Sequence, residues 1–419
     1  MYKKYIGLCN LTNIRYVITF FISIYILLCI YIRVNMQFWY SQPVFHIYNI
    51  KYWINPPGVI NKNPPPVNKF VNLINNKLIE VVSDTDISHT IDPTGVLIKR
   101  ICDFIKTNYV RGNNDTEYKP STEDIIAYLS KNAYSSFFNI YTEKMMLFQK
   151  GDLIVPEHDD ICGVVSGRIL NLNINANKQV TSFPLYYIDN LCIKPTHRKM
   201  GLASQIIQTF YYNISRKNPH VNAYIFKREG AMTAIVPLVF YYTHCFDIIS
   251  IIAENDKPKM INLFKADAKN FHILIDSINA NKKKYKCTIL PDVSNLLHLI
   301  TTGKIVMYAI IDAGVVIALY VFRMINLRFN GNNVVECIAV ISGVEDSILV
   351  SGFMDCLIDI HKKNNIAFIL IEDTSDCGIL IKLLQSNSSV RCIFKSRTAF
   401  FLYNYVSYSF INTKTLLIY

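Results

Sequence analysis

The sequence lacks the cysteine patterns of metal-binding and disulfide-rich proteins. Its 11 cysteines are scattered, with no Cys-x-x-Cys pair and no cysteine–histidine ligand spacing. This argues against a structural zinc site and against a disulfide framework, and we expect no metal. Cysteines of this kind are expected to be small buried hydrophobic residues in a reducing compartment. Tryptophan is also scarce, with 2 residues.

The composition fits a large, basic, well-packed protein. The chain has 419 residues, enough for roughly two to three domains. Hydrophobic residues make up 51% and the formal net charge is +12. Such a charge suits nucleic acid, an anionic membrane face or a phosphate-rich cofactor, and composition does not choose among them. The richness in Asn, Lys, Ile and Tyr is typical of an AT-rich genome such as that of a large DNA virus.

One N-terminal segment has the composition of a membrane span. Tyr16 to Ile32 is an uninterrupted apolar run between Arg15 and Arg33. It is long enough to cross a hydrocarbon core of about 30 Å. It is longer than the apolar core of a signal peptide, and no small-residue cleavage site follows it. We therefore expect residues 1–15 to be a tail and residues 16–33 a single-pass anchor, with the lysines before it weakly favouring a cytosolic N-terminus.

The remaining chain divides by pattern into an arm and two halves. Residues 34–70 are dense in proline and predict an extended arm. Residues 71–253 predict helices from Val96 and from a Ser121 cap, then strands, then a strand, basic turn and helix. Residues 254–419 begin with a weakly periodic crossing up to Lys286 and then predict a helix, three strands, a helix, a strand and a short helix. This order indicates an α/β fold with a mixed, acetyltransferase-like sheet.

The stretch from Tyr187 to Tyr212 has the pattern of a phosphate-binding turn. An apolar strand leads into Arg198 to Ala203, which supplies two cations and a glycine immediately before an apolar helix. Consecutive backbone N–H groups and a helix N-terminus bind polyphosphates, so the pattern predicts a coenzyme A cradle. The second half has no such turn and is expected to bind something else. Cys192, within the strand, has no histidine partner in the sequence and is interpreted as core.

Three blocks resemble the protein N-myristoyltransferase (glycylpeptide N-tetradecanoyltransferase) family. They are QFWYSQPV at Gln37 to Val44, IDNLCIKPTHRKMGLA at Ile188 to Ala203, and the C-terminal FFLYNYVSYSFINTKTLLIY. The resemblance covers about residues 37 to 419. It implies two fused acetyltransferase-like (GNAT) halves around a saddle-shaped sheet, with acyl-CoA mainly on the first half and peptide mainly on the second.

The resemblance also implies a reaction and its residues. A myristoyl group would move from myristoyl-CoA to the amine of an N-terminal glycine, by a monomer without nucleic-acid partners. The backbone N–H groups of Asn190 and Leu191 would form the oxyanion hole, and the α-carboxylate of Tyr419 would be the base. The implied cofactor-binding residues are Gln37, Phe38, Trp39, Leu191, Cys192, Ile193, Arg198, Lys199, Met200, Gly201, Leu202 and Ala203. The implied substrate-binding residues are Tyr109, Gly230, Tyr242, His244, Tyr403 and Asn404.

Two departures from the family pattern and two alternatives remain. Arg111 to Asp115 stands where the family is acidic, and Lys227 to Glu229 stand where it has small or hydroxyl residues. Divergent peptide specificity or loss of activity would follow. The alternatives are an acetyl-CoA-dependent N-acetyltransferase and an inactive acyl-CoA-binding protein tethered to a membrane. Because acyl-CoA and nascent glycine termini are cytosolic, we expect the body on the cytosolic side, at a host or virion membrane if the source is viral.

Overall fold

The computed structural model describes residues 11–35, 37–54, 57–81, 93–109, 116–144, 147–149, 152–154, 159–176, 179–253 and 263–419. The chain divides into two compact units, Met1–Val44 and Phe45–Tyr419. Three predicted features lie outside the described residues: most of the N-terminal tail, the departure at Arg111 to Asp115, and residues 254–262 of the expected crossing.

The first unit is helical. It contains α1 (Leu11–Asn35) and the short α2 (Gln37–Tyr40). Within α1, the segment Ile14–Val34 has 21 residues and is long and apolar enough to cross a membrane. A signal sequence near the N-terminus meets the same criterion, so the anchor stays a prediction.

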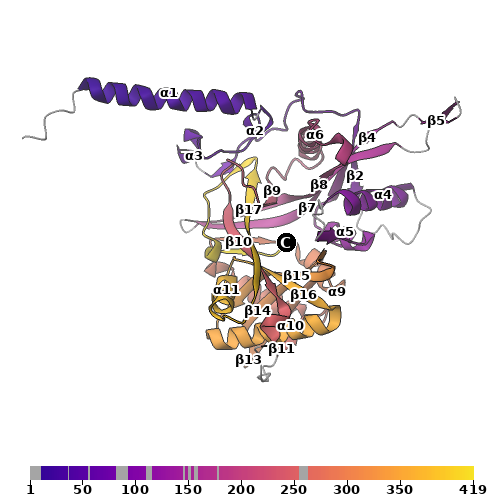
Figure 1. The fold of residues 1–419 in the computed structure, drawn as a ribbon, viewed down its shortest axis with the longest axis vertical. Coiled ribbons are helices and arrows are strands. Elements are labelled where there is room, and N and C mark those ends of the chain that lie inside the picture. The colour runs from indigo at the N-terminus through magenta and orange to yellow at the C-terminus, as the bar shows by residue number, and fades with distance from the viewer. Residues whose placement is uncertain are drawn as a thin grey trace, which may run out of the picture. The chain divides into compact units, whose positions relative to one another are not determined.

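The second unit is built on one mixed sheet (Figure 1). Among the described residues this sheet has 15 strands, and its main path runs β11-β13-β14-β15-β16-β10-β17-β9-β8-β7-β12-β19. Three of its pairs are parallel, β8 with β9, β12 with β19, and β15 with β16. The strands of the sheet are β2 (Asn76–Val81), β3 (Thr116–Tyr118), β4 (Ser136–Glu143), β7 (Asp160–Ala176), β8 (Gln179–Ile193), β9 (Tyr224–Glu229), β10 (Val239–Asp247), β11 (Leu263–Lys265), β12 (Cys287–Leu290), β13 (Ile305–Asp312), β14 (Val315–Phe329), β15 (Asn332–Ser342), β16 (Ile366–Glu372), β17 (Cys392–Tyr403) and β19 (Thr415–Leu417).

Two strand pairs lie outside that sheet, and helices cover it. The pairs are β1 (Gly58–Val59) with β18 (Tyr405–Val406), and β5 (Leu147–Gln149) with β6 (Asp152–Ile154). The helices are α3 (Ile50–Ile54), α4 (Pro93–Asn108), α5 (Thr122–Leu129), α6 (Leu202–Lys217), α7 (Ile248–Ile252), α8 (Phe271–Asn281), α9 (Val293–Thr301), α10 (Asp346–Asn364) and α11 (Cys377–Ser386), with the 3-10 turns η1 (Pro195–His197), η2 (Lys282–Lys284) and η3 (Asn412–Lys414).

The hydrophobic core joins the two expected halves. One cluster of buried apolar residues runs from Ala127 to Tyr419 and draws on both halves, while a second gathers around α10 and α11. The two expected halves are also interleaved in the sheet, because β10 of the first half lies between β16 and β17 of the second. The expected halves 71–253 and 254–419 therefore share one compact unit.

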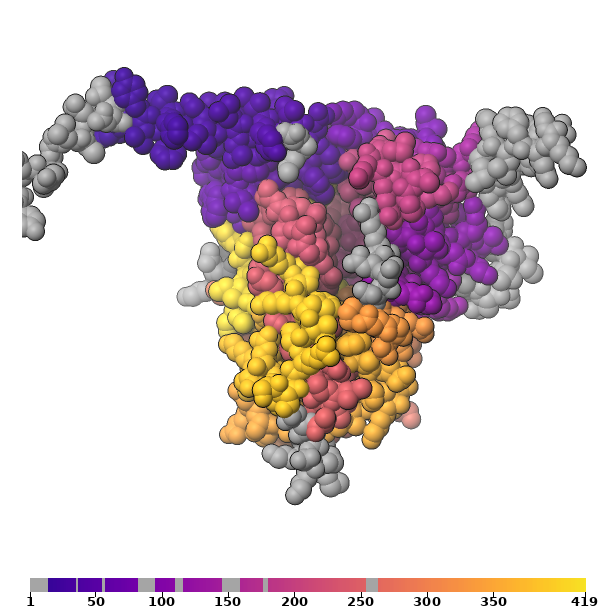
Figure 2. All heavy atoms as spheres, viewed as in Figure 1, coloured from indigo at the N-terminus to yellow at the C-terminus, as the bar shows by residue number. Residues whose placement is uncertain are grey.

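The C-terminus is drawn into this unit. Residues Leu416 to Tyr419 are fully buried, and the chain end lies in the middle of the body (Figure 1). Figure 2 shows the surface part of the last segment, in yellow, beside the orange segment that precedes it in the chain. The burial expected of the apolar tail is thus confirmed.

Several sequence predictions need correction. The arm is not extended throughout, because α2 and α3 form where no proline interrupts the chain. From Phe45 onward it does lie across the body: Phe45 O accepts from Val236 N at 2.8 Å, and β1 pairs with β18. The lysine-rich crossing contains α8, whose apolar face the sequence analysis did not recognise. The predicted cap at Ser121 is confirmed, as a capping box with Asp124.

Candidate active site

The predicted cradle forms a cavity of about 420 Å³ at the start of α6. Of the predicted cofactor residues from Leu191 to Ala203, all except the exposed Met200 line it. The lining consists of Asn108, Tyr109, Leu191, Cys192, Ile193, His197, Arg198, Lys199, Gly201, Leu202 and Ala203. His197 was missed by the sequence analysis. Gln37, Phe38 and Trp39 belong to the first unit, so the described structure leaves their cofactor role a prediction.

The backbone shapes this cradle. Gly201, the N-cap of α6, has φ +81° and Lys199 has φ +67°. The Arg198 side chain holds the turn from inside, because its Nε donates to Ile193 O at 3.0 Å and its Nη2 to Asn108 O at 3.3 Å. Helix α6 can lie close on β7 because Gly163 and Gly167 lack side chains: a Cβ on Gly167 would come within 2.7 Å of Phe210 Cζ. The turn is thus positioned by close helix–strand packing.

A second cavity, of about 480 Å³, is lined by Asp189 and Asn190 of β8, the residues directly before Leu191 of the first cavity. Tyr109 lines both cavities. Its other charged lining residues are Asp124, Arg168, Lys227, Glu229, Arg323 and Glu336. We call it the acceptor cavity and the first one the cofactor cavity.

A β-bulge contributes residues to both cavities, Asn190 to the second and Leu191 to the first. Val164 is opposite Cys192 and Ser166 is opposite Asp189, so Asn190 and Leu191 face the single residue Val165. Asn190 accordingly adopts φ +53°. A bulge interrupts the regular ladder and re-aims backbone groups, which is what an oxyanion hole requires.

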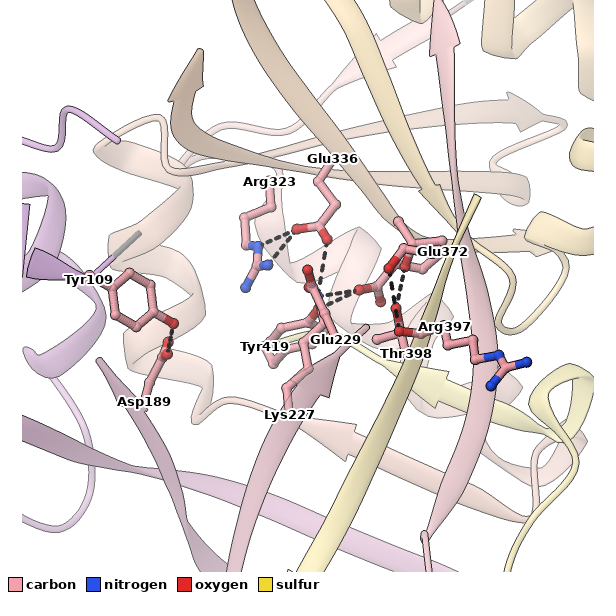
Figure 3. Close-up of polar contacts among 12 residues, drawn as sticks. Tyr109, Asp189, Lys227, Glu229, Arg323, Glu336, Glu372, Arg397, Thr398 and Tyr419 are labelled. Carbon is pink, nitrogen blue, oxygen red and sulfur yellow. Dashed lines mark hydrogen bonds and ion pairs between the residues drawn. The ribbon is translucent and has the colours of Figure 1, made fainter. Parts of the chain in front are cut away.

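One predicted oxyanion donor is already engaged. The Asn190 N–H donates to Asp189 Oδ1 at 2.8 Å. The same oxygen accepts from the Tyr109 hydroxyl at 2.7 Å, a contact drawn in Figure 3. To bind an acyl oxygen, the Asn190 N–H must first leave the Asp189 carboxylate. The side chain of Asn190 donates to Ser166 Oγ at 2.8 Å and fixes the bulge from the other strand.

The C-terminal residue lies in a buried network of charges (Figure 3). The Tyr419 hydroxyl donates to Glu372 Oε1 at 2.6 Å, and Arg323 lies 4.4 Å from the centre of the Tyr419 ring. Lys227 Nζ is 2.8 Å from Glu372 Oε1, 2.7 Å from Glu229 Oε1 and 3.3 Å from Glu336 Oε1. Arg323 Nε in turn donates to Glu336 Oε2 at 2.8 Å.

These contacts set the ionisation of the network. Burial raises the pKa of Glu372 to about 7, with Lys227 opposing and Glu336 adding to the shift. Burial also opposes ionisation of Glu336, but Arg323 and Lys227 lower its pKa to about 2. Burial would lower the pKa of Lys227, yet its three carboxylate neighbours raise it well above the usual value. The charge that Lys227 brings at this departure from the family pattern is therefore neutralised by its carboxylate neighbours inside the fold.

The predicted peptide-site residues are not all brought together. Tyr109 lines both cavities, and Gly230 (φ +75°) directly follows the cavity residue Glu229. Tyr242 and His244 line neither cavity, because they alternate along β10 with Tyr241, which packs in the core beside Tyr419. His244 Nδ1 instead lies 3.3 Å from Gln385 Nε2 of α11.

Tyr403 and Asn404 also lie away from the two cavities. Tyr403 packs edge-on against Tyr211 and Tyr224. Asn404 accepts from Asn61 N at 2.8 Å and donates to Asn61 O at 3.0 Å. Its role in the fold is to tie the arm to the body.

Eight of the ten described cysteines are buried as expected, whereas Cys29 is partly exposed and Cys392 is exposed. Every described cysteine is free, and burial raises the pKa of Cys192 to about 12, so it is no nucleophile at neutral pH. The structure also brings together possible metal-ligand atoms of Glu143, Cys162 and His197, all within 4.8 Å of one another. Burial raises the pKa of Cys162 to about 11, so its thiol is protonated at neutral pH. Sequence spacing does not reveal this group.

Comparison with solved structures decides the fold. No protein-family model matches the sequence, and no curated protein matches it significantly. The structure is similar to that of Saccharomyces cerevisiae N-myristoyltransferase with bound myristoyl-CoA, with a TM-score of 0.66 and 12% identity over 90% of this chain and 94% of that chain. The chain has the N-myristoyltransferase fold. A structure of the yeast enzyme with myristoyl-CoA and inhibitors agrees, with a TM-score of 0.65 and 13% identity over 90% of this chain and 92% of that chain.

Proposed function

We propose that this protein is an N-myristoyltransferase that moves a myristoyl group from myristoyl-CoA to the amine of an N-terminal glycine. The observation that carries the proposal is a pair of cavities that share Tyr109 and are lined by successive residues of the bulge, Asp189 and Asn190 in one and Leu191 in the other. A thioester at this bulge would have its coenzyme on one side and an acceptor amine on the other. Holding two reactants in such a geometry is a large part of the catalysis of group transfer.

The cofactor cavity supports the first half of the reaction. In the proposed complex the backbone of Lys199 to Ala203 and the N-terminus of α6 bind the coenzyme phosphates. Arg198 keeps the turn in shape through its two carbonyl contacts. The Gln37 to Trp39 segment would cover the nucleotide, as the family resemblance implies.

The bulge supports stabilisation of the developing negative charge. In the proposed transition state the Leu191 N–H and the Asn190 N–H donate to the thioester oxygen. The Asn190 N–H must first break its hydrogen bond to Asp189 Oδ1. One oxyanion-hole donor is typically worth about 2.7–4 kcal/mol of barrier. A carboxylate beside this hole opposes the charge, which favours a second candidate function, an acyl-CoA-binding protein without transfer activity.

The buried chain end supports the proposed base. An α-carboxylate in water has a pKa of about 3.3–3.7 and an α-ammonium one of about 7.7–8.0. Burial disfavours both charged forms and brings the two values together. Tyr419 is fully buried and its hydroxyl is fixed by Glu372. It lines neither cavity, but its neighbours Lys227, Arg323 and Glu336 line the acceptor cavity, which supports its α-carboxylate as the group that removes the proton.

The proposed location follows from the substrates. With α1 as a single-pass anchor, the body would face the cytosol, where acyl-CoA and nascent chains occur. Protease treatment of sealed vesicles tests this arrangement: we expect the body to be digested, and protection of the body would contradict it.

Transfer itself is tested with isotope-labelled myristoyl-CoA and a set of glycine-initiated peptides. We expect label in the peptide, and the same peptides with an acetylated N-terminus as control should stay unlabelled. Tight acyl-CoA binding without transfer would instead support the second candidate function. Labelling from acetyl-CoA at a comparable rate would favour an N-acetyltransferase.

A further inference from the structure

The acceptor cavity contains a buried cation that the proposed reaction does not use. Arg168 lies on β7, is 4% exposed and lines the cavity. Its guanidinium carbon is 5.2 Å from the ring centre of Tyr128 and 5.4 Å from that of Tyr187. The two aromatic rings hold the guanidinium but offer it no negative charge.

Arg168 differs in this respect from the other cations near the cavity. Lys227 is bound by three carboxylates, Arg323 is paired with Glu336, and Lys304 is paired with Asp124. Among the residues that the structure describes, no ion pair involves Arg168, and its buried Nη1 has no hydrogen-bond partner. Asp189, on the neighbouring strand, forms no ion pair with Arg168 among the described residues, and its Oδ1 accepts from Tyr109 and Asn190. Burial lowers the pKa of Arg168 and outweighs the opposing effect of the Asp189 charge, which raises it.

A buried charge with no direct ion pair and an unmade hydrogen bond is expensive. Proteins keep buried charges where a partner neutralises them, and each unmade hydrogen bond of a buried charged group adds to the cost. A neutral carbonyl oxygen would satisfy the hydrogen bond but leave the charge. A carboxylate satisfies both, because the planar guanidinium matches its two oxygens.

We propose that Arg168 binds a carboxylate of the acceptor, so that the protein prefers glycine-initiated peptides with an acidic side chain close to the N-terminal glycine. The inference rests on the proposed function, since it deepens the choice of acceptor at the same site. It assigns a specificity-determining residue to a position where the sequence shows only a charge within an apolar strand.

The first test uses the unmodified protein. Peptides that begin with glycine carry Asp, or its neutral isostere Asn, at one of positions two to five. Their dissociation constants are measured by calorimetry with a non-transferable thioether analogue of myristoyl-CoA present. Peptide binding can be measured whether or not the protein transfers the acyl group. The test of Arg168 therefore remains valid if the proposed function fails. We expect Asp to bind about ten- to hundredfold more tightly than Asn at one of these positions. Equal binding at all four positions would overturn the proposal.

The second test assigns the preference to Arg168. In Arg168→Met, the ratio of Asp to Asn affinity should fall to about one, and in Arg168→Lys it should fall less, because the charge stays but the planar fork is lost. Arg216→Met is the matched control: its guanidinium also lies over a tyrosine ring, that of Tyr212 at 3.5 Å, but outside both cavities. It should keep the full ratio.

Two results would contradict the assignment. If Arg168→Met keeps the full ratio of Asp-peptide to Asn-peptide affinity, a group other than Arg168 binds the acidic side chain. If Arg168→Met weakens acyl-CoA binding as much as acidic-peptide binding, the guanidinium serves the cofactor. Should Arg168→Met not fold, the Arg168→Lys ratio decides, and an unchanged ratio there would overturn the proposal.

Discussion

Lys227 offers a direct test of the buried charge network. Its ammonium contacts Glu229, Glu336 and Glu372, two of which are at most 2% exposed in their side chains. Lys227→Met keeps the length of the side chain and removes the charge. Arg323 then remains as the partner of Glu336 and the nearby cation that acts on Glu372.

The expected cost follows from the unpaired charges. Removing one partner of a buried ion pair typically costs about 3–5 kcal/mol of unfolding free energy. We expect that loss near pH 8. At pH 5 we expect a smaller loss, because Glu372, whose pKa is raised to about 7 by burial, is then mostly protonated.

Denaturant unfolding of the purified protein measures these differences. Lys363→Met is the control, since Lys363 is 54% exposed and forms a helical i,i+4 pair with Asp359, and such pairs are worth about 0.3–0.5 kcal/mol. The double variant with Glu372→Gln should recover part of the loss. A loss below about 1 kcal/mol for Lys227→Met at pH 8 would refute the view that its ammonium neutralises this network.

Three further predictions concern the chain end, the pH dependence and the cradle. One glycine added after Tyr419 should slow transfer by roughly a hundredfold or more while sparing acyl-CoA binding, because it moves the proposed base; unchanged turnover would exclude the terminal carboxylate. Because burial raises the pKa of Glu372 to about 7 in the folded protein, the folded state binds more protons than the unfolded state between about pH 4.5 and 7. Stability measured relative to Glu372→Gln should therefore fall as the pH rises through that range, by on the order of 3 kcal/mol, and a flat difference would contradict the shift. Gly201→Ala should cost about 1–2 kcal/mol of stability, because Gly201 has φ +81°, and should also weaken acyl-CoA binding. Gly303→Ala, at φ +70°, should cost a similar amount of stability without weakening acyl-CoA binding. Equal acyl-CoA affinity in the two variants would contradict the cradle.

Local patterns were sufficient to predict most elements of the second half. The order predicted after Lys286, a helix, three strands, a helix, a strand and a short helix, corresponds to α9, β13, β14, β15, α10, β16 and α11. Their apolar periodicity is strong because each buries one face or both. Strand β4 and helix α8 were missed, since a nearly fully buried strand shows no alternation and α8 begins in a lysine-rich context.

The cofactor side of the site was more predictable than the acceptor side. The cradle is one continuous segment, so its residues could be found by pattern. The acceptor cavity combines Arg168, Lys227, Arg323 and Glu336 from four separate strands, and no local spacing connects them. A usable signal was present: each is a charge within an apolar strand, which a folded protein keeps only with a partner or a function.

The most direct test of the account is a transfer assay with labelled myristoyl-CoA and glycine-initiated peptides, acidic ones included, on the full chain. We expect label on the glycine amine, and loss of most of that label when a residue is added after Tyr419. Myristoyl-CoA that binds tightly but is never transferred to any of these peptides would contradict it.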